Sequence, residues 1–306
     1  MGALRRERVR SDCTLLSQQG VCFAKTTRKE GFMANFDIEL VGKVGSMALV
    51  DRGYQDMNYN VIARISRELR PGFVWVTSGA AEIGRLDYLK RTGKELNGSN
   101  EDNKTDYSAQ GQSILMQTYR QFVDSRFSVR QILVEHQHFN DEEKREHLHA
   151  MLCRCPGQNA IPIVNYNDPV SYEENRKHEI GRILAQRGHA IECVDNDETA
   201  SQIACLVKCK TLLILTTTDG IYRDPDDPKS LVGRVGGKDI YELIENVEEL
   251  QTHCAGASRA GANGARAKLE YIKEPLKNGT TVIIANSRYA INDALSGNVP
   301  CTRIGL

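Results

Sequence analysis

The sequence predicts a doubly wound α/β fold, a three-layer αβα sandwich with a mainly parallel central sheet. Short strand-like runs alternate with longer amphipathic segments along most of the 306 residues. Most of these runs are apolar on both faces, as is typical of parallel strands that helices cover on both sides. The chain is also long enough to form one large α/β unit or two packed lobes.

Six runs rich in β-branched and other apolar residues are expected to be strands. In chain order they are residues 36–43, 72–77, 129–134, 160–165, 211–216 and 280–286. Three sets of apolar residues between them recur at helical spacing and predict helices that pack on the sheet. The sets are Val61, Ile62, Ile65 and Leu69; Leu115, Tyr119 and Phe122; and Ala200, Ile203, Ala204 and Val207. The polar stretches 90–106 and 171–193 are expected to be loops or covers over this framework.

The composition narrows the classes of function. Forty basic and forty acidic side chains cancel, so no overall field attracts nucleic acid or an anionic membrane. No apolar stretch reaches the length of a membrane span or a signal sequence, and the nine cysteines form no secreted-type framework. We therefore expect a cytoplasmic protein in which any anionic ligand is held by local charges. Residues 1–35 are basic and poorly patterned, so we expect a disordered extension or an arm before a domain at 36–306.

Small residues follow the second predicted strand, in the stretch VTSGAAEIGR at residues 76–85. Small side chains let a ligand approach the backbone, and a helix N-terminus offers unpaired amides to an anion. The stretch therefore predicts an anion-receiving turn at Ser78, Gly79 and Ala80, with Ser78 as the N-cap. The alternative is an ordinary strand-to-helix turn with a serine cap.

Two lysines accompany glycine-rich turns. Lys43 ends the first predicted strand just before Gly45 and Ser46, and Lys268 follows the glycines of GANGARAK at residues 261–268. A lone lysine in such a turn is commonly a solvated surface residue. In a parallel sheet, however, the loops after the strands meet at one edge, where they could gather around one anionic ligand.

Two acidic and amide-rich segments also follow strand-like runs, NYND at 165–168 and VDNDET at 194–199. Asp197 could be a favourable charge at a helix N-terminus. In the other interpretation, Asp168 and Asn196 bind a ligand ammonium and its polar neighbours, while Asp197 orients nearby lysines. The turn-rich loop 217–228 comes after the strand at 211–216 and could cover a nucleotide base or serve as an ordinary turn.

Histidines and cysteines are concentrated between residues 136 and 155, which contain four of the seven histidines and two cysteines. His149 and Cys153 are four residues apart and share a helical face, whereas His147 and His149 diverge. The spacing matches no standard zinc pattern, so the sequence predicts no metal ligands.

Taken in order, these segments resemble the amino acid kinase superfamily, and most closely its glutamate 5-kinases. VGKVGS resembles the first K-x-G-[ST] loop, VTSGAAEIGR the V-[ST]-S-G-A loop, and YSAQGQSILMQTYRQF the helix that opens with A-x-G-Q-S. IPIVNYND resembles P-x-[IV]-N-E-N-D, and VDNDETAS resembles G-D-N-D-x-L-S. LLILTTTDGIY resembles L-L-L-L-T-D-x-x-G-L-Y, and GANGARAKL resembles G-T-G-G-M-x-T-K-L. The matches run colinearly from about residue 37 to residue 304.

The resemblance implies transfer of the ATP γ-phosphoryl group to the side-chain carboxylate of glutamate or a related acid, with Mg²⁺. It implies that Lys43 and Lys268 flank the phosphoryl group and that Asp197 organises them. The residues implied for the acceptor are Ser78, Gly79, Ala80, Asp168 and Asn196. Those implied for the nucleotide are Gly45, Ser46, Thr216, Tyr222 and Gly261. Members of this family often associate through their sandwich helices, which implies a homo-oligomer.

Some positions depart from the family pattern. Tyr166 stands where glutamate kinases carry Glu, Thr217 where they carry Asp, and Ala262 and Ala265 replace a hydroxyl residue and Met. The segment between Asp168 and Asp195 is longer than in the family. The C-terminal PUA domain of many glutamate 5-kinases is expected to be absent.

These departures leave three alternatives open. The acceptor could be another amino acid or organic acid, or a phosphate or phosphonate, which would favour an extra contact from Lys177 or His178. The protein could also be a non-catalytic nucleotide sensor or storage protein.

Overall fold

The computed structural model describes residues 37–193, 195–254 and 264–306, which all fall within one compact unit, Ala34–Leu306. The expected extension at residues 1–35 and the expected ligand residue Gly261 lie outside the described residues. Within the described ranges, no helix is both long enough and apolar enough to cross a membrane.

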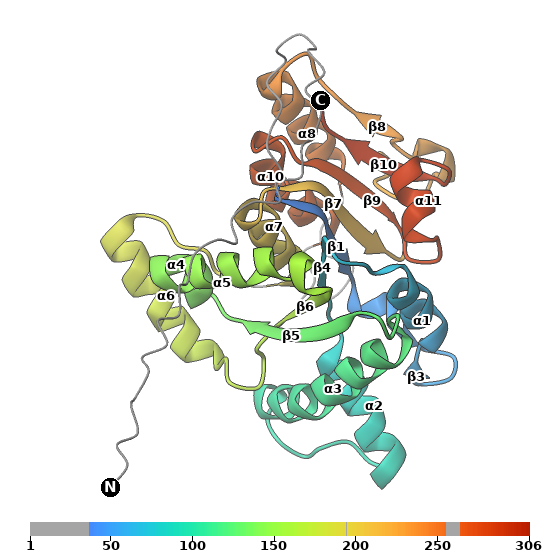
Figure 1. Ribbon diagram of the computed structural model, residues 1–306, viewed down its shortest axis with the longest axis vertical. Helices are drawn as coiled ribbons and strands as arrows, with labels where there is room; N and C mark the ends of the chain where they lie inside the picture. Colours follow the sequence, from blue (N-terminus) through green and yellow to red (C-terminus); the bar gives the residue numbers. More distant parts are fainter. Residues whose placement is uncertain (1–36, 194, 255–263) are drawn as a thin grey trace, which may run out of the picture. The chain divides into compact units, whose positions relative to one another are not determined.

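An eight-stranded sheet forms the centre of the unit, in the order β5-β6-β4-β1-β7-β9-β10-β8 (Figure 1). Every neighbouring pair is parallel except β9 and β10. The strands are β1 (Ile38–Val44), β4 (Phe73–Val76), β5 (Ser128–Val134), β6 (Ala160–Tyr166), β7 (Cys209–Thr216), β8 (Arg234–Val235), β9 (Thr281–Asn286) and β10 (Cys301–Ile304). A separate small ribbon pairs β2 (Val50–Asp51) with β3 (Asp56–Met57).

Both faces of the sheet are buried, as the apolar runs predicted. Along β7, Leu212 and Ile214 join one core cluster, while Leu213 and Leu215 join the other. The first cluster includes residues of α4 (Gln137–Asn140), α5 (Glu142–Arg154), α7 (Asn196–Leu206), α8 (Ile240–His253), α9 (Gly264–Tyr271) and α10 (Lys273–Lys277). The second includes residues of α1 (Tyr59–Glu68), α2 (Ala80–Thr92), α3 (Asn100–Phe122) and α11 (Ile291–Ser296). The predicted three-layer sandwich is therefore confirmed.

The six predicted strands are present, with ends that differ by at most two residues. The helical sets at 61–69 and 200–207 are fully buried, whereas Phe122 is only partly buried. The sequence did not predict β10, which has four residues and alternates partly and fully buried positions. The two-residue strands β2, β3 and β8 were also missed, because a run that short has no measurable periodicity.

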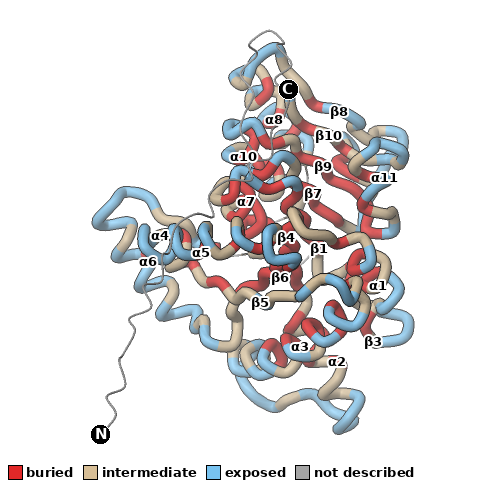
Figure 2. Tube along the Cα trace, viewed as in Figure 1, coloured by how far each residue is buried: buried red, intermediate tan, exposed pale blue. Residues whose placement is uncertain are grey.

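The polar stretch 171–193 is mostly a helix, α6 (Glu173–Arg187), and not a loop. Its only buried residue is Ile180, so it lacks the apolar stripe from which a helix is predicted. Local contacts stabilise it instead: Lys177 Nζ lies 2.5 Å from Glu173 Oε1, and Gly188 ends the helix at φ 73°. Figure 2 shows that α6 is largely exposed. The structure thus contains an exposed helix where a loop or a cover was expected.

Two glycines let α2 and α3 cross in close contact. A Cβ on Gly84 would lie 1.8 Å from the carbonyl oxygen of Tyr107, and a Cβ on Gly111 would lie 1.9 Å from that of Ala80. No other residue type fits at these positions unless the helices move apart. The crossing fixes the start of α2, which reaches the edge of the sheet.

Candidate functional site

A cavity of about 880 Å³ lies at the carboxyl ends of four adjacent strands, β6, β4, β1 and β7. Because these strands are parallel, their carboxyl ends share one edge, where open α/β sheets bind ligands. Lys43, Ser78, Asn165 and Thr216, one from each strand or the turn after it, line the cavity. The expectation that loops distant in sequence meet at one edge is thus met.

Two lysines converge on one aspartate in this cavity. Lys43 Nζ of β1 lies 2.5 Å from Asp197 Oδ1, and Lys268 Nζ of α9 lies 2.7 Å from Asp197 Oδ2. Lys43 is 7% exposed and Asp197 6%, so Lys43 is not a solvated surface residue. Asp197 holds the two ammonium groups side by side, and the three groups together carry one positive charge.

The environment keeps Asp197 ionised. Burial on its own raises the pKa of this carboxyl, but the charges of Lys43 and Lys268 outweigh burial and hold the pKa below its usual value. The backbone is fixed as well, because Asp195 Oδ1 accepts hydrogen bonds from the amides of Asp197 and Glu198 at 2.7 and 3.0 Å. Asp195 is therefore the N-cap of α7.

The turn after β4 is hydrogen-bonded to the end of β1. Ser78, which was predicted to be the N-cap of α2, does not have that role. Ser78 Oγ donates a hydrogen bond to the carbonyl of Val44 at 2.7 Å, and so connects the turn after β4 to β1. Gly79 is the N-cap, with φ 92°, which favours glycine. A Cβ on Gly79 would lie 3.6 Å from Ser46 Cα. The side chain of Ser78 thus joins the two loops and does not cap the helix.

The joined turns present small residues to the cavity. Gly45, Ser46, Gly79 and Ala80 all line it. The amides in the first turn of α2 have no intrahelical acceptor, and the helix dipole makes this end positive. The arrangement suits an anion that lies against the backbone between β1 and α2.

Polar residues from the end of β6, the loop after it and the start of α7 also line the cavity. Lys104 Nζ of α3 lies 2.9 Å from Asp168 Oδ1. Asn165 Nδ2 donates to Gln112 Oε1 at 2.8 Å. Asn196 Oδ1 is buried and has no hydrogen-bond partner within the described part of the chain. Asp168 and Asn196 thus reach the cavity as predicted, but Asp168 already has a cationic partner.

Tyr166 and Arg176 form a contact that the sequence did not predict. The hydroxyl of Tyr166 lies 2.8 Å from Ser171 Oγ and also accepts a hydrogen bond from Arg176. Burial raises the pKa of Tyr166, so the phenol remains neutral. Arg176 is the basic residue of α6 that lines the cavity; Lys177 and His178, which the sequence suggested, do not.

The cavity contains more charges than the motifs indicated. Six cationic side chains line it: Lys43, Arg52, Arg85, Lys104, Arg176 and Lys268. Five acidic ones accompany them: Glu82, Glu95, Asp168, Asp195 and Asp197. Arg52, Lys104 and Arg176 lie outside the glycine and acidic motifs, and Arg85 ends the motif at 76–85 without having been singled out as a site residue.

A second cavity of about 590 Å³ lies beside the first, and Thr216, Thr217 and Lys268 line both. Tyr222, from the loop after β7, lines this second cavity. Arg288 Nη2 donates to both carboxylate oxygens of Asp219 at 2.9 Å, which ties that loop to the end of β9. Thr216 and Tyr222 thus come together as predicted, whereas Gly45 and Ser46 lie on the first cavity. The site has two compartments joined at Lys268.

Comparison with known proteins agrees with this fold and with the motifs. The amino acid kinase family profile matches residues 40–286, and the chain belongs to the amino acid kinase family. Two relatives are the glutamate 5-kinases of Streptococcus suis (strain 05ZYH33) and Clostridium perfringens (strain 13 / Type A). The first is 30% identical over 261 residues, 81% of this chain and 64% of that protein. The second is 29% identical over 262 residues, 81% of this chain and 87% of that protein. The chain therefore spans less than two thirds of the Streptococcus suis relative.

Two solved structures share the fold at low sequence identity. The UMP kinase of Bacillus anthracis has a TM-score of 0.50 and 13% identity, with 87% of this chain and 95% of that chain covered. A protein from Aeropyrum pernix K1 has a TM-score of 0.51 and 14% identity, with 88% and 100% covered. These likenesses concern the fold alone.

Proposed function

We propose that this protein is an ATP-dependent kinase that transfers a phosphoryl group to the carboxylate of a small acid, with glutamate as the leading acceptor and glutamate 5-phosphate as its product. The observation that carries the proposal is the pair of lysines held by Asp197 where two cavities join. The identity of about 30% to glutamate 5-kinases supports the choice of acceptor. The protein acts in the cytoplasm as a homo-oligomer in this proposal.

The chemistry needs charge neutralisation more than it needs a base. A carboxylate with a reference pKa near 4.3 is already ionised at neutral pH, so no residue has to remove a proton from the acceptor. The difficulty is to bring two anions together. Lys43 and Lys268 offset charge on the transferring phosphoryl oxygens, and Asp197 positions both. One charge pair at 4 Å contributes on the order of 4 kcal/mol at an effective dielectric of 20.

The two compartments take the two substrates. ATP occupies the cavity lined by Thr216 and Tyr222, with its γ-phosphoryl group at Lys268. The acceptor occupies the larger cavity, against the first turn of α2 and the side chains of Asp168 and Asn196. The reacting groups then meet at the residues that line both cavities.

Mg²⁺ fits this site as an ion carried by the nucleotide. Both carboxylate oxygens of Asp197 are engaged by lysines, so this side chain offers no free ligand. Mg²⁺ keeps several waters and binds phosphate oxygens readily. When bound with ATP, it supplies further charge neutralisation at the phosphates.

A second candidate is a kinase of the same type for a dianionic acceptor that lacks an ammonium group, such as a dicarboxylate, a phosphate or a phosphonate. Two observations favour it: Lys104 already pairs with Asp168, which would otherwise bind the ammonium, and Arg176 from α6 faces the same cavity. For glutamate, Lys104 must release Asp168 or share it. Lys104 is 61% exposed at its side chain, so its release costs little.

The test is ADP formation from ATP and Mg²⁺ with each candidate acceptor, in the presence of hydroxylamine. Hydroxylamine converts an acyl phosphate to a hydroxamate, so a carboxylate acceptor gives ADP and hydroxamate in equal amounts. A phosphate acceptor gives ADP without hydroxamate. We expect acceptor-dependent turnover with glutamate. If glutamate does not stimulate ADP formation but a phosphate or a dicarboxylate does, the second candidate is correct. If no acid stimulates ADP formation, both candidates are wrong.

Loss of Lys268 should strongly reduce turnover without unfolding the protein. Lys268→Ala removes one of two cations at the transferring group, and we expect kcat to fall by at least about a hundredfold, as for other charge-stabilising groups. Lys273→Ala is the matched control, because Lys273 follows on α10 and pairs with Glu248 and Glu270 outside both cavities. Equal activity of the two variants would contradict the assigned role.

A further inference from the structure

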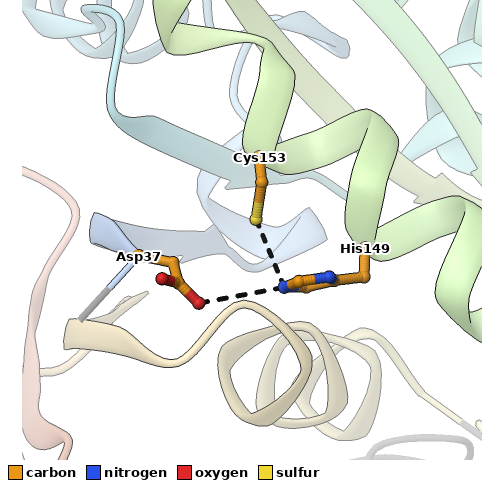
Figure 3. Close-up of side chains that lie close together, drawn as sticks. All are labelled: Asp37, His149 and Cys153. Atoms are coloured by element: carbon orange, nitrogen blue, oxygen red, sulfur yellow. Dashed lines mark hydrogen bonds and ion pairs between the residues drawn. The ribbon is translucent and has the colours of Figure 1, made fainter. Parts of the chain in front are cut away.

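Three side chains of different chemistry meet between α5 and the start of β1 (Figure 3). His149 and Cys153 lie one turn apart on α5, and Asp37 directly precedes β1. Cys153 Sγ lies 3.4 Å from His149 Nε2, and Asp37 Oδ2 lies 3.8 Å from the same nitrogen. The three ligand atoms all lie within 4.8 Å of one another. None of these residues lines either cavity of the proposed kinase site.

The spacing of these atoms is close to what a tetrahedral zinc ion requires. With Zn–S near 2.3 Å and Zn–N and Zn–O near 2.0–2.1 Å, tetrahedral angles place S and N about 3.5 Å apart and N and O about 3.4 Å apart. The observed 3.4 and 3.8 Å differ from these values by a few tenths of an ångström. The separation of sulfur and carboxylate oxygen, at most 4.8 Å, must shorten by up to about 1.3 Å to reach about 3.5 Å. The side chain of Asp37 is 41% exposed and has room to turn.

We propose that Asp37, His149 and Cys153 form a binding site for Zn²⁺ or a similar divalent transition-metal ion. Imidazole and thiolate are the ligands that zinc prefers, and the carboxylate completes three protein ligands, with water as the fourth. Zinc binds the neutral imidazole through Nε2 and the thiolate of Cys153, whose proton leaves to solvent. One proton is therefore released for each ion bound.

Access and anchoring both suit an ion that arrives from solution. The side chain of His149 is 39% exposed, so the ion can reach the site. The amide of Asp37 donates to the carbonyl of Lys208 at 3.2 Å, which fixes the start of β1 beside β7. The bound ion would connect α5 to the first strand of the sheet. Its effect should therefore fall on stability and leave phosphoryl transfer unchanged.

The test is titration of the full-length, reduced protein with Co²⁺, which gives intense near-ultraviolet absorption only when a thiolate coordinates it. We expect one Co²⁺ per chain with thiolate absorption, displaced by one equivalent of Zn²⁺. Cys153→Ser and His149→Gln should each weaken Zn²⁺ binding by about a hundredfold or more. This is more than the loss of a residue that only hydrogen-bonds to a metal ligand usually causes. The apparent affinity should rise with pH, because a proton is released.

Matched controls separate this site from other thiols. Cys205→Ser, and a chain with Cys13→Ser and Cys22→Ser, should bind Co²⁺ as the wild type does. In the unaltered protein, Zn²⁺ should also protect Cys153 from alkylation, as located by mass spectrometry, so the result does not depend on variants that fold. Absence of thiolate absorption, or absorption that persists in Cys153→Ser, would overturn the proposal. Because no acceptor or ATP is involved, the outcome is independent of the proposed kinase activity.

Discussion

At the residue scale, the site depends on a carboxylate that would be costly to bury alone. An isolated buried charge carries a desolvation cost of several kcal/mol, and two lysines offset that cost for Asp197. A buried ion pair of this kind is weak evidence for stability, so its position where two cavities join points to a role in ligand binding.

Asp197→Asn should reduce stability at neutral pH, and the difference from wild type should shrink in acid. The variant leaves two ammonium groups without their carboxylate, so we expect a loss of about 3–5 kcal/mol in the free energy of unfolding at pH 7. The folded-state pKa of Asp197 lies below the ordinary value of 3.8. Its stabilisation is therefore fully present above about pH 4 and is lost as pH falls through the folded pKa. Urea unfolding of both proteins between pH 7 and pH 3 measures this difference.

The control for this comparison is Asp168→Asn. Asp168 pairs with a lysine that is 61% exposed, so its loss should change the free energy of unfolding by at most about 1 kcal/mol. A difference between Asp197→Asn and wild type that stays constant down to pH 3 would show that the carboxylate contributes through packing and not through charge.

At the scale of elements, the anion-receiving start of α2 depends on how closely α2 approaches α3. The approach is possible because Gly84 and Gly111 face backbone carbonyls across the crossing. The first residues of α2, Ala80 and Ala81, line the larger cavity. A substitution at the crossing of α2 and α3 should therefore lower the free energy of unfolding and also weaken binding of the acceptor.

Gly111→Ala should destabilise the protein, although alanine favours helices. Its Cβ would meet the carbonyl oxygen of Ala80 at 1.9 Å, so the helices must separate. Overpacking of this kind costs about 1–3 kcal/mol, and movement of α2 should raise the KM for the acceptor more than that for ATP. Gly181→Ala, in the exposed helix α6 with open space around the Cβ position, should instead stabilise by about 0.5–1 kcal/mol. Chemical denaturation and steady-state kinetics of both variants check this, and equal effects of the two would rule out the crossing as the cause.

At the scale of the whole molecule, the features that could be predicted from the sequence are those that follow from strand direction and from short local motifs. Parallel strands bring the segments after Lys43, Ser78 and Thr216 to one edge whatever the details of packing, so the site could be located in advance. Asp197 met both lysines because its motif begins a helix at the same edge. The meeting of these loops required only the direction of the strands, whereas the pairing of Asp197 with the two lysines was implied by the family resemblance.

The rest depends on three-dimensional contacts that have no periodic signal. Helix α6 buries one residue, so neither its existence nor the inward direction of Arg176 could be predicted. The N-cap of α2 was misassigned because Gly79, with a positive φ, occupies the N-cap position, while Ser78 Oγ donates to the carbonyl of Val44 in another strand. Asp37 and His149 are more than a hundred positions apart, and only the packing of α5 beside the start of β1 brings them together.

The two-compartment site makes a prediction for the molecule as a whole. If ADP and the acceptor occupy separate cavities that share, among the described residues, only Thr216, Thr217 and Lys268, each should stabilise the protein without the other, and their effects should add. A ligand at one hundred times its dissociation constant contributes about 2.7 kcal/mol. In a unit of this size that free energy corresponds to a rise in Tm of about 5–10 °C for each ligand.

Arg288→Ala provides the discriminating variant, because Arg288 ties the loop after β7 to β9 and lines only the smaller cavity. Differential scanning calorimetry should show a smaller shift with ADP in this variant and an unchanged shift with glutamate. A loss of both shifts would mean that the cavities act as one pocket. The wild type could also show a Tm shift with ADP and with another acid but none with glutamate. That result would support the two-compartment site and would show that the acceptor is not glutamate.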